Sequence, residues 1–144
     1  MISRILVPTD GSKVAQRAAQ YAIHLAKNLN ATVIVLSVAD RRTLSSIAET
    51  AVPVIEIECH LEEVAEGYVE ELTKQCYENG VQSKGYVTTG YPIDEIAREA
   101  EDLNADLIVM GSRGRSALTA TVLGSVAYGV IHKDIKIPVM VVKG

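Results

Sequence analysis

The stretch that decides the fold is Asp106-Leu-Ile-Val-Met-Gly-Ser-Arg-Gly-Arg-Ser-Ala-Leu-Thr-Ala-Thr-Val-Leu-Gly-Ser125. Its apolar start stops at Gly111, as a buried parallel strand does at the carboxyl edge of a sheet. Gly111 and Gly114 leave no Cβ in the way, so successive N–H groups can face one anion-binding concavity. Gly124 and Ser125 precede apolar residues at helical spacing, which predicts more free amides at a helix start. We expect a strand, an anion-binding loop and a helix in succession.

Elsewhere, short β-branched runs alternate with amphipathic segments. The patterns predict strands over 5–7, 32–38, 83–88, 107–110 and 138–143, and helices over about 13–29, 55–79, 93–103 and from 126 onward. The segment 40–53 has no sustained period, and we expect an irregular connection that could include a helical turn. Five strands alternating with four helical regions predict an α/β fold, a three-layer α/β/α sandwich with a mostly parallel sheet.

Length and composition restrict the class of protein. A chain of 144 residues predicts one domain, 1–144, large enough to bury a core. The net charge of −4 disfavours nucleic acid and anionic membranes as partners. No apolar run approaches the ~20 residues of a membrane span. The amino terminus resembles a strand more than a signal peptide, so we expect a cytoplasmic protein.

The two cysteines do not suggest a metal site or a disulfide. Cys59 and Cys76 form no Cys-x-x-Cys pair. Cys76 is in helical register with apolar residues of the predicted 55–79 helix, which predicts a core position. The glutamates of that helix are spread over several turns, so we interpret them as a solvated face.

The glycine spacing resembles a known pattern. Gly111, Gly114, Gly124 and Ser125 form Gly-x2-Gly-x9-Gly-Ser, which resembles the phosphate-binding signature of the ATP-binding branch of the universal stress protein family. The resemblance extends over nearly the whole chain. It implies strand order 3-2-1-4-5 in a Rossmann-like fold of the adenine nucleotide alpha hydrolase type. An alternative remains, in which the glycines only permit a tight strand-to-helix crossing and a close contact between helix and sheet.

The implied strand order also locates a ligand. In open α/β sheets, ligands bind beyond the carboxyl ends of the strands where the winding direction reverses, which here lies between the first and fourth strands. The loops after those two strands therefore meet at the expected crevice. The resemblance implies that adenine and ribose lie against Pro8, Thr9, Asp10, Val38 and Met110, and that the phosphates lie against Gly111, Gly114, Gly124, Ser125 and Val126.

Several of these residues have two interpretations. Asp10 either contacts the ligand, including a nucleotide-bound divalent cation such as Mg or Mn, or caps the first helix. Arg113 and Arg115 either neutralise phosphate or are exposed loop charges. Ser112 and Ser116 are weaker candidates for phosphate contact.

Three functions fit the pattern. The first is an ATP-binding, nucleotide-dependent regulator of the stress response. The sequence does not indicate whether ATP, ADP or AMP is preferred. The second is a slow, metal-assisted ATP hydrolase. The third is a stress-response interaction module without nucleotide. The glycines are not followed by the Gly-Lys-Ser/Thr of a P-loop, and His24, His60 and His132 lie apart in the sequence, which leaves no obvious general base.

The carboxyl-terminal run suggests self-association. Pro138 to Val142 is almost entirely apolar and lies at a sheet edge in the implied order. Exposed apolar edges invite pairing. The family resemblance implies a homodimer through this strand.

Overall fold

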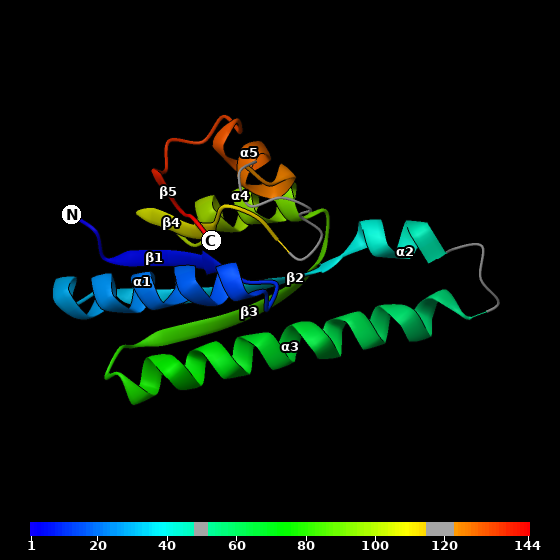
Figure 1. The fold of residues 1–144 in the computed structure, drawn as a ribbon, viewed down its shortest axis with the longest axis horizontal. Helices are drawn as coiled ribbons and strands as arrows, with labels where there is room; N and C mark the ends of the chain where they lie inside the picture. Colours follow the sequence, from blue (N-terminus) through cyan, green and yellow to red (C-terminus); the bar gives the residue numbers. More distant parts are fainter. Residues whose placement is uncertain (48–51, 115–122) are drawn as a thin grey trace.

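The computed structural model describes residues 1–47, 52–114 and 123–144. Its five strands form one parallel sheet in the order β3-β2-β1-β4-β5, which confirms the predicted α/β fold and strand order (Figure 1). The strands are β1 (Arg4–Pro8), β2 (Thr32–Asp40), β3 (Ser83–Gly90), β4 (Leu107–Gly111) and β5 (Val139–Val142). The helices within the described ranges are α1 (Lys13–Leu29), α2 (Arg41–Ile47), α3 (Val54–Glu78), α4 (Pro92–Asp102) and α5 (Ser125–Ile131).

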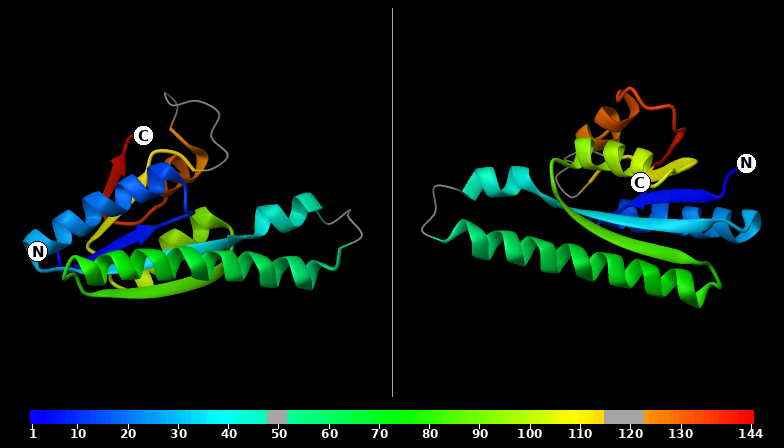
Figure 2. Two further views of the ribbon diagram at one scale, coloured as in Figure 1. Left: turned by 60° about the horizontal axis from the view of Figure 1, so that its bottom comes forward. Right: turned by 180° about the vertical axis from the view of Figure 1, so that it is seen from behind.

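The helices form two outer layers. Side chains of α1 and α3 pack in one buried cluster, and those of α4 and α5 pack in a second cluster on the other face of the sheet. Both faces of the central strands are therefore covered, which explains why these strands are continuous apolar runs. In Figures 1 and 2, α2 and the first half of α3 project beyond the sandwich as an arm, past the carboxyl ends of the strands.

The expectation of an irregular connection over 40–53 that could include a helical turn is met only in its helical part. Strand β2 continues to Asp40, and residues 41–47 form the helix α2, which adds a fifth helical region to the four predicted. The Asp40 carboxylate accepts the amide of Arg42 at 2.9 Å and its guanidinium at 2.6 to 3.1 Å, and so holds the first turn. Residues 41–43 are exposed, so no apolar period marks the helix. Residues 48–51 lie outside the described part.

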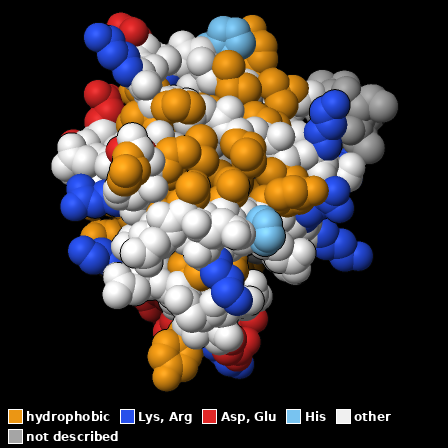
Figure 3. Space-filling view, turned by 90° about the vertical axis from the view of Figure 1, so that its left-hand side faces the viewer, with side chains coloured by type: hydrophobic (Ala, Val, Ile, Leu, Met, Phe, Trp, Pro, Cys, Tyr) orange, Lys and Arg blue, Asp and Glu red, His pale blue; other side chains and the backbone are white. Residues whose placement is uncertain are grey.

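Strands β3 and β5 are the edges of the sheet, as predicted. Strand β3 is correspondingly polar, whereas β5 is apolar and leaves Met140 37% exposed. Figure 3 shows the side of the molecule at the left of Figure 1, where β5 and the segment before it lie in the upper half. Hydrophobic side chains gather in that upper half.

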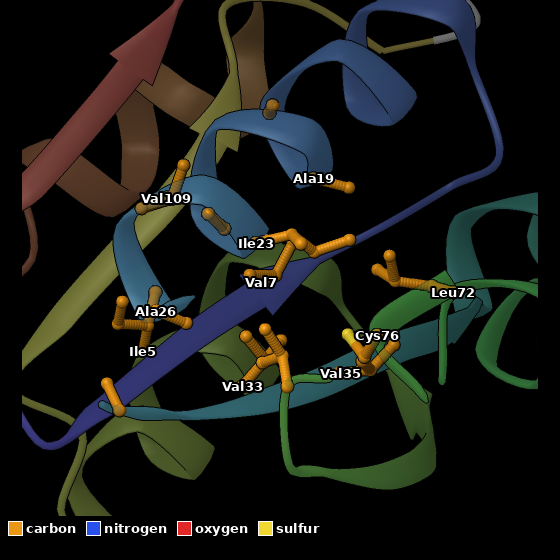
Figure 4. Close-up of a cluster of buried hydrophobic side chains, with 14 of the residues drawn as sticks. Ile5, Val7, Ala19, Ile23, Ala26, Val33, Val35, Leu72, Cys76 and Val109 are labelled. Atoms are coloured by element: carbon orange, nitrogen blue, oxygen red, sulfur yellow. The ribbon is translucent and has the colours of Figure 1, made fainter. Parts of the chain in front are cut away.

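The core confirms the prediction for Cys76. Its thiol is fully buried on α3 beside Leu72 and the β2 side chains Val33 and Val35 (Figure 4). Burial raises the pKa of the Cys76 thiol, which disfavours the reactive thiolate. Cys59, the other cysteine of α3, is exposed. No helix in the described ranges combines the length and the apolarity that a bilayer span requires.

A carboxylate ties the amino terminus to the start of β4. Asp106 Oδ2 accepts the main-chain amides of Ser3 at 2.8 Å and Arg4 at 2.9 Å. These two hydrogen bonds, the one from Ser3 first, hold the pKa of Asp106 below its ordinary value. Ionised Asp106 is therefore favoured in the folded chain relative to the unfolded chain.

We expect Asp106→Asn to lower the melting temperature at pH 7 by about 2–4 °C. Because the folded pKa is depressed, the stabilisation is present above the unfolded pKa of about 3.9 and is lost as the pH falls through the lower folded pKa. The difference between the native chain and the variant should therefore shrink on acidification. Thermal melts of both chains between pH 7 and pH 3 check this, with the exposed Asp134→Asn as the control; a difference independent of pH would contradict it.

Candidate functional site

A cavity of about 660 Å³ lies at the carboxyl ends of β1, β2 and β4, where the two loops were predicted to meet. One face of α3, the start of α4 and the start of α5 complete its walls. Eleven of the twelve predicted site residues line this cavity, and the twelfth, Arg115, lies outside the described residues. The eleven are Pro8, Thr9, Asp10, Val38, Met110, Gly111, Arg113, Gly114, Gly124, Ser125 and Val126.

The loop after β1 is held by its own polar side chains. Ser12 Oγ accepts the amide of Ala15 at 3.2 Å and is therefore the N-cap of α1, not Asp10. Asp10 Oδ1 accepts the amide of Ser12 at 3.0 Å, which fixes the turn that precedes the helix. Thr9 is anchored to β2, because its carbonyl accepts the hydroxyl of the buried Ser37 at 2.9 Å. The capping alternative for Asp10 is thus replaced by a role in the turn.

Gly11 allows α3 to approach this loop closely. Its φ of +74° is in the region that favours glycine. A Cβ at this position would overlap the ring of Tyr68, a cavity-lining residue of α3. The sequence offered no local signal for Tyr68, because its place in the site depends on a contact between segments far apart in the chain.

The three glycines after β4 serve different purposes. A Cβ on Gly111 would lie 2.8 Å from Val14 Cγ1 and 3.1 Å from the Val14 carbonyl carbon, so this glycine lets α1 approach the sheet. Gly124 closes the neck of the loop, because its amide donates to the Ser112 carbonyl at 2.6 Å. For Gly111 the close-packing alternative is therefore supported. For Gly124 the N–H is engaged by Ser112 in this structure, so the predicted amide contact with phosphate stays a prediction.

Gly114 lies where the two loops meet. A Cβ there would come within 2.7 Å of Asp10 Oδ2. The second carboxylate oxygen of Asp10 therefore faces the main chain of the glycine loop, while the first holds the turn before α1. This juxtaposition joins the two stretches of sequence that were predicted to converge.

The start of α5 completes this end of the cavity. Gly124 is the N-cap with no side-chain hydrogen bond, so the first-turn amides of Ser125 and Val126 are left at a cavity wall. Arg113 lines this end of the cavity, and its guanidinium lies beside Gly144, where an added Cβ would be 3.0 Å from Nη2. Ser112 is buried and does not line the cavity, and its amide donates to the Val142 carbonyl at 2.8 Å. Ser116 lies outside the described residues.

The opposite end of the cavity was largely missed by sequence reasoning. Arg42 and Thr43 of α2 border it, and the α3 wall is formed by Leu61, Val64, Ala65 and Tyr68. Arg42 and Thr43 belong to the segment 40–53, which has no hydrophobic period. The four α3 residues lie on one helix face, but their spacing does not show which segment that face contacts.

Neither histidine chemistry nor a metal cluster is evident in the described part. His24, His60 and His132 are exposed, and none of them lines the cavity. Within residues 1–47, 52–114 and 123–144, no three His, Cys, Asp or Glu side chains gather as a metal-binding group. The carboxylates at the cavity wall are Asp10 and Asp40.

The fold and the site define a class of protein. A parallel sheet of order 3-2-1-4-5 covered by helices on both faces, with a cavity where the winding reverses, is a Rossmann-like α/β/α fold. The chain belongs to the universal stress protein family, whose model matches residues 1–143.

Individual relatives agree with this assignment. The chain is 38% identical to universal stress protein MJ0531 of Methanocaldococcus jannaschii, over 99% of this chain and 83% of that protein. The solved structure of MJ0577, from the same organism, superposes with a TM-score of 0.87 at 35% identity and covers 100% of this chain and 97% of that one. A universal stress protein solved in complex with cAMP superposes with a TM-score of 0.68 at 25% identity, over 99% and 97% of the two chains.

Proposed function

We propose that this chain binds an adenine nucleotide, with ATP as the ligand, and acts as a nucleotide-dependent regulator in the cytoplasmic stress response. The observation that carries the proposal is the meeting of Asp10 and Gly114 across one cavity that contains eleven of the predicted contact residues. The similarity to a universal stress protein crystallised with cAMP supports a ligand of this chemistry.

The two ends of the cavity suit the two ends of a nucleotide. Phosphate oxygens require amides and cations, which are supplied by the loop around Gly114, by Arg113 and by the first turn of α5. A purine requires apolar surface, which Val38 and the α3 wall supply. The nucleotide therefore lies with its phosphates beside β4 and its base toward β2 and α3.

A divalent cation fits this arrangement as a companion of the nucleotide. Mg²⁺ is commonly held by one or two carboxylates together with substrate phosphates. Asp10 Oδ2, which faces the glycine loop, is the one carboxylate that we assign to such an ion. When bound, Mg or Mn would neutralise phosphate charge, and Asp10 would keep its other oxygen on the Ser12 amide.

Slow ATP hydrolysis is the second candidate, because Asp10 places a carboxylate where phosphates are expected. Asp10 alone is a weak catalyst here, since one of its oxygens already holds a turn. The described cavity wall contains no histidine that could activate water. We therefore favour binding over turnover.

Calorimetric titration with Mg-ATP, followed by a steady-state hydrolysis assay on the same sample, tests this function. We expect a dissociation constant in the low micromolar range or tighter, about −8 kcal/mol. We also expect turnover far below the enzyme median of about 10 per second. No heat of binding at micromolar protein would refute the nucleotide function, and turnover near the median would make the chain an enzyme. Chromatography of any nucleotide released on denaturation would distinguish ATP from ADP and AMP.

A further inference from the structure

A second cavity, of about 790 Å³, lies at the opposite edge of the sheet from the cavity assigned to nucleotide. It is bordered by the amino-terminal parts of β1, β2 and β3 and by the chain at the carboxyl-terminal ends of α3 and α4. In Figure 1 this edge of the sheet is at the left, whereas the arm is at the right. The described residues that line the two cavities have no member in common, so a ligand here would not share the contacts of a nucleotide.

We propose that this second cavity binds a small aromatic acid, that is, a planar ring that carries a carboxylate. The inference is independent of the proposed nucleotide function. It is carried by two cations and two aromatic rings that border one cavity. The volume falls within the range of about 300–1,000 Å³ that is typical of small-molecule sites.

The floor of the cavity is the α4 face of the sheet. Side chains alternate between the two faces of a strand, so residues two positions apart share a face. Three lining residues, one from each strand, therefore point to the same side as the cluster packed beneath α4 and α5. They are Arg4, Thr32 and Lys84, two positions before Leu6, Ile34 and Tyr86 of that cluster.

The strand register fixes the separation of the two cations. Arg4 is the partner of Thr32 on β2, and Lys84 of β3 is the partner of Ile34. Arg4 and Lys84 are thus two strands apart and offset by two residues, which corresponds to about 12 Å between their Cα atoms. Both side chains are long enough to reach a carboxylate that lies between them.

The charge of the lining is opposite in sign to that of the chain. The whole chain carries −4, whereas the charged side chains that line this cavity are Arg4, Lys84 and Asp102, two cations and one carboxylate. Asp102 Oδ2 accepts a hydrogen bond from Arg98 at 3.4 Å. In the described part of the chain, neither Arg4 nor Lys84 forms an ion pair. A carboxylate in the cavity would supply the acceptor that a guanidinium and an ammonium prefer.

Two tyrosines supply the surface for a ring. Tyr77, in the last turn of α3, is 85% exposed, and Tyr86 of β3 is half-buried against the α4 cluster. Both line the cavity. An aromatic ring that covers them displaces water from apolar surface and adopts the offset or edge-to-face packing that such rings favour. An aromatic acid therefore matches both the rings and the cations, whereas a simple anion would leave the rings in water.

The test is a titration of the full chain with 2-naphthoate, followed by two-dimensional NMR of the main-chain amides. We expect the amides of Thr32, Lys84 and Tyr86 to shift and that of Gly114 to stay unchanged, with a dissociation constant of about 1 mM or tighter. The neutral analogue 2-naphthamide should bind at least about fivefold more weakly, because it cannot form charge-assisted hydrogen bonds as an acceptor anion. Saturating Mg-ATP should leave the binding of naphthoate unchanged.

Two variants examine the cations separately. Arg4→Gln and Lys84→Gln should each weaken naphthoate binding about fivefold. Both residues are exposed, so the fold should tolerate glutamine, and a defect in one variant leaves the other as a readout. The matched control is Lys13→Gln, since Lys13 is an exposed cation of α1 that lines neither cavity.

The outcomes separate this inference from the proposed function. Naphthoate that shifts none of the three amides would overturn it, as would equal affinity for naphthamide or an affinity that both glutamine variants keep. Displacement of naphthoate by Mg-ATP would locate the probe in the first cavity and overturn it as well. A chain that binds naphthoate but not ATP would leave this inference standing while the proposed function fails. Weaker binding in both variants, with full binding in the control, supports the inference.

Discussion

Replacing Gly114 by valine is expected to weaken ATP binding at least about a hundredfold, a loss of about 2.7 kcal/mol. The Cβ alone would come within 2.7 Å of Asp10 Oδ2, and the two methyl groups would occupy the end of the cavity assigned to phosphate. The fold should persist, because Gly114 is not among the glycines with positive φ, which are Gly11 and Gly80. Calorimetry with Mg-ATP measures the loss, and a thermal melt verifies that the variant is folded.

The matched control for this experiment is Gly67→Val. It makes the same chemical change on α3 at a position where an added Cβ meets no atom within 4 Å. Gly124→Val is a poorer test of the same idea, since its Cβ would lie 2.8 Å from Arg113 Cα and would displace the loop itself. A folded Gly114→Val chain that binds ATP as tightly as the Gly67→Val control would show that the nucleotide does not use this loop.

A Val141→Lys substitution is expected to convert a homodimer into monomers. We propose that two copies pair through β5, antiparallel about a two-fold axis, which satisfies the open backbone groups of both edges. The apolar surface that would be covered includes Met140 on β5 and, on α5, Tyr128 and Ile131, which are 56% and 44% exposed. A lysine in the middle of β5 would place two like charges close to the axis and leave them poorly hydrated.

Light scattering at micromolar protein concentrations measures this change in mass. Ile55→Lys is the control, because it exchanges another exposed apolar residue for lysine on the arm, away from β5. We expect the control to remain dimeric. A native chain that is monomeric, or a Val141→Lys variant that is as firmly dimeric as the control, would eliminate the β5 interface.

Local sequence features were sufficient to predict the layers of the fold, whereas the strand order, and with it the place of the cavity, was implied by the family resemblance. The runs at 32–38 and 107–110 are buried at most positions on both faces, so they consist mainly of hydrocarbon side chains, with the hydrogen-bonded Ser37 as a buried exception. Gly111 and the turn after Pro8 mark where two strands stop. The carboxyl ends of parallel strands lie at one edge of the sheet, so both loops had to reach the same region.

The roles of individual residues depended on tertiary contacts. The sequence places Gly111 and Gly124 in a pattern typical of phosphate binding. Only the tertiary structure shows that Val14 packs closely against Gly111 and that the Ser112 carbonyl accepts the amide of Gly124. The same holds for Ser12, which caps α1 in place of Asp10.

Neither helix α2 nor the place of the apolar α3 wall at the cavity could be predicted from the sequence. A hydrophobic period is visible only where a segment packs against the core along its length, and α2 is held instead by the ion pair between Arg42 and Asp40. The α3 wall from Leu61 to Tyr68 has a helical period, but that period does not show which segments lie across the cavity from it. The sequence by itself determined which segments are buried and where the chain turns, whereas the contacts between distant segments decided which atoms face the ligand.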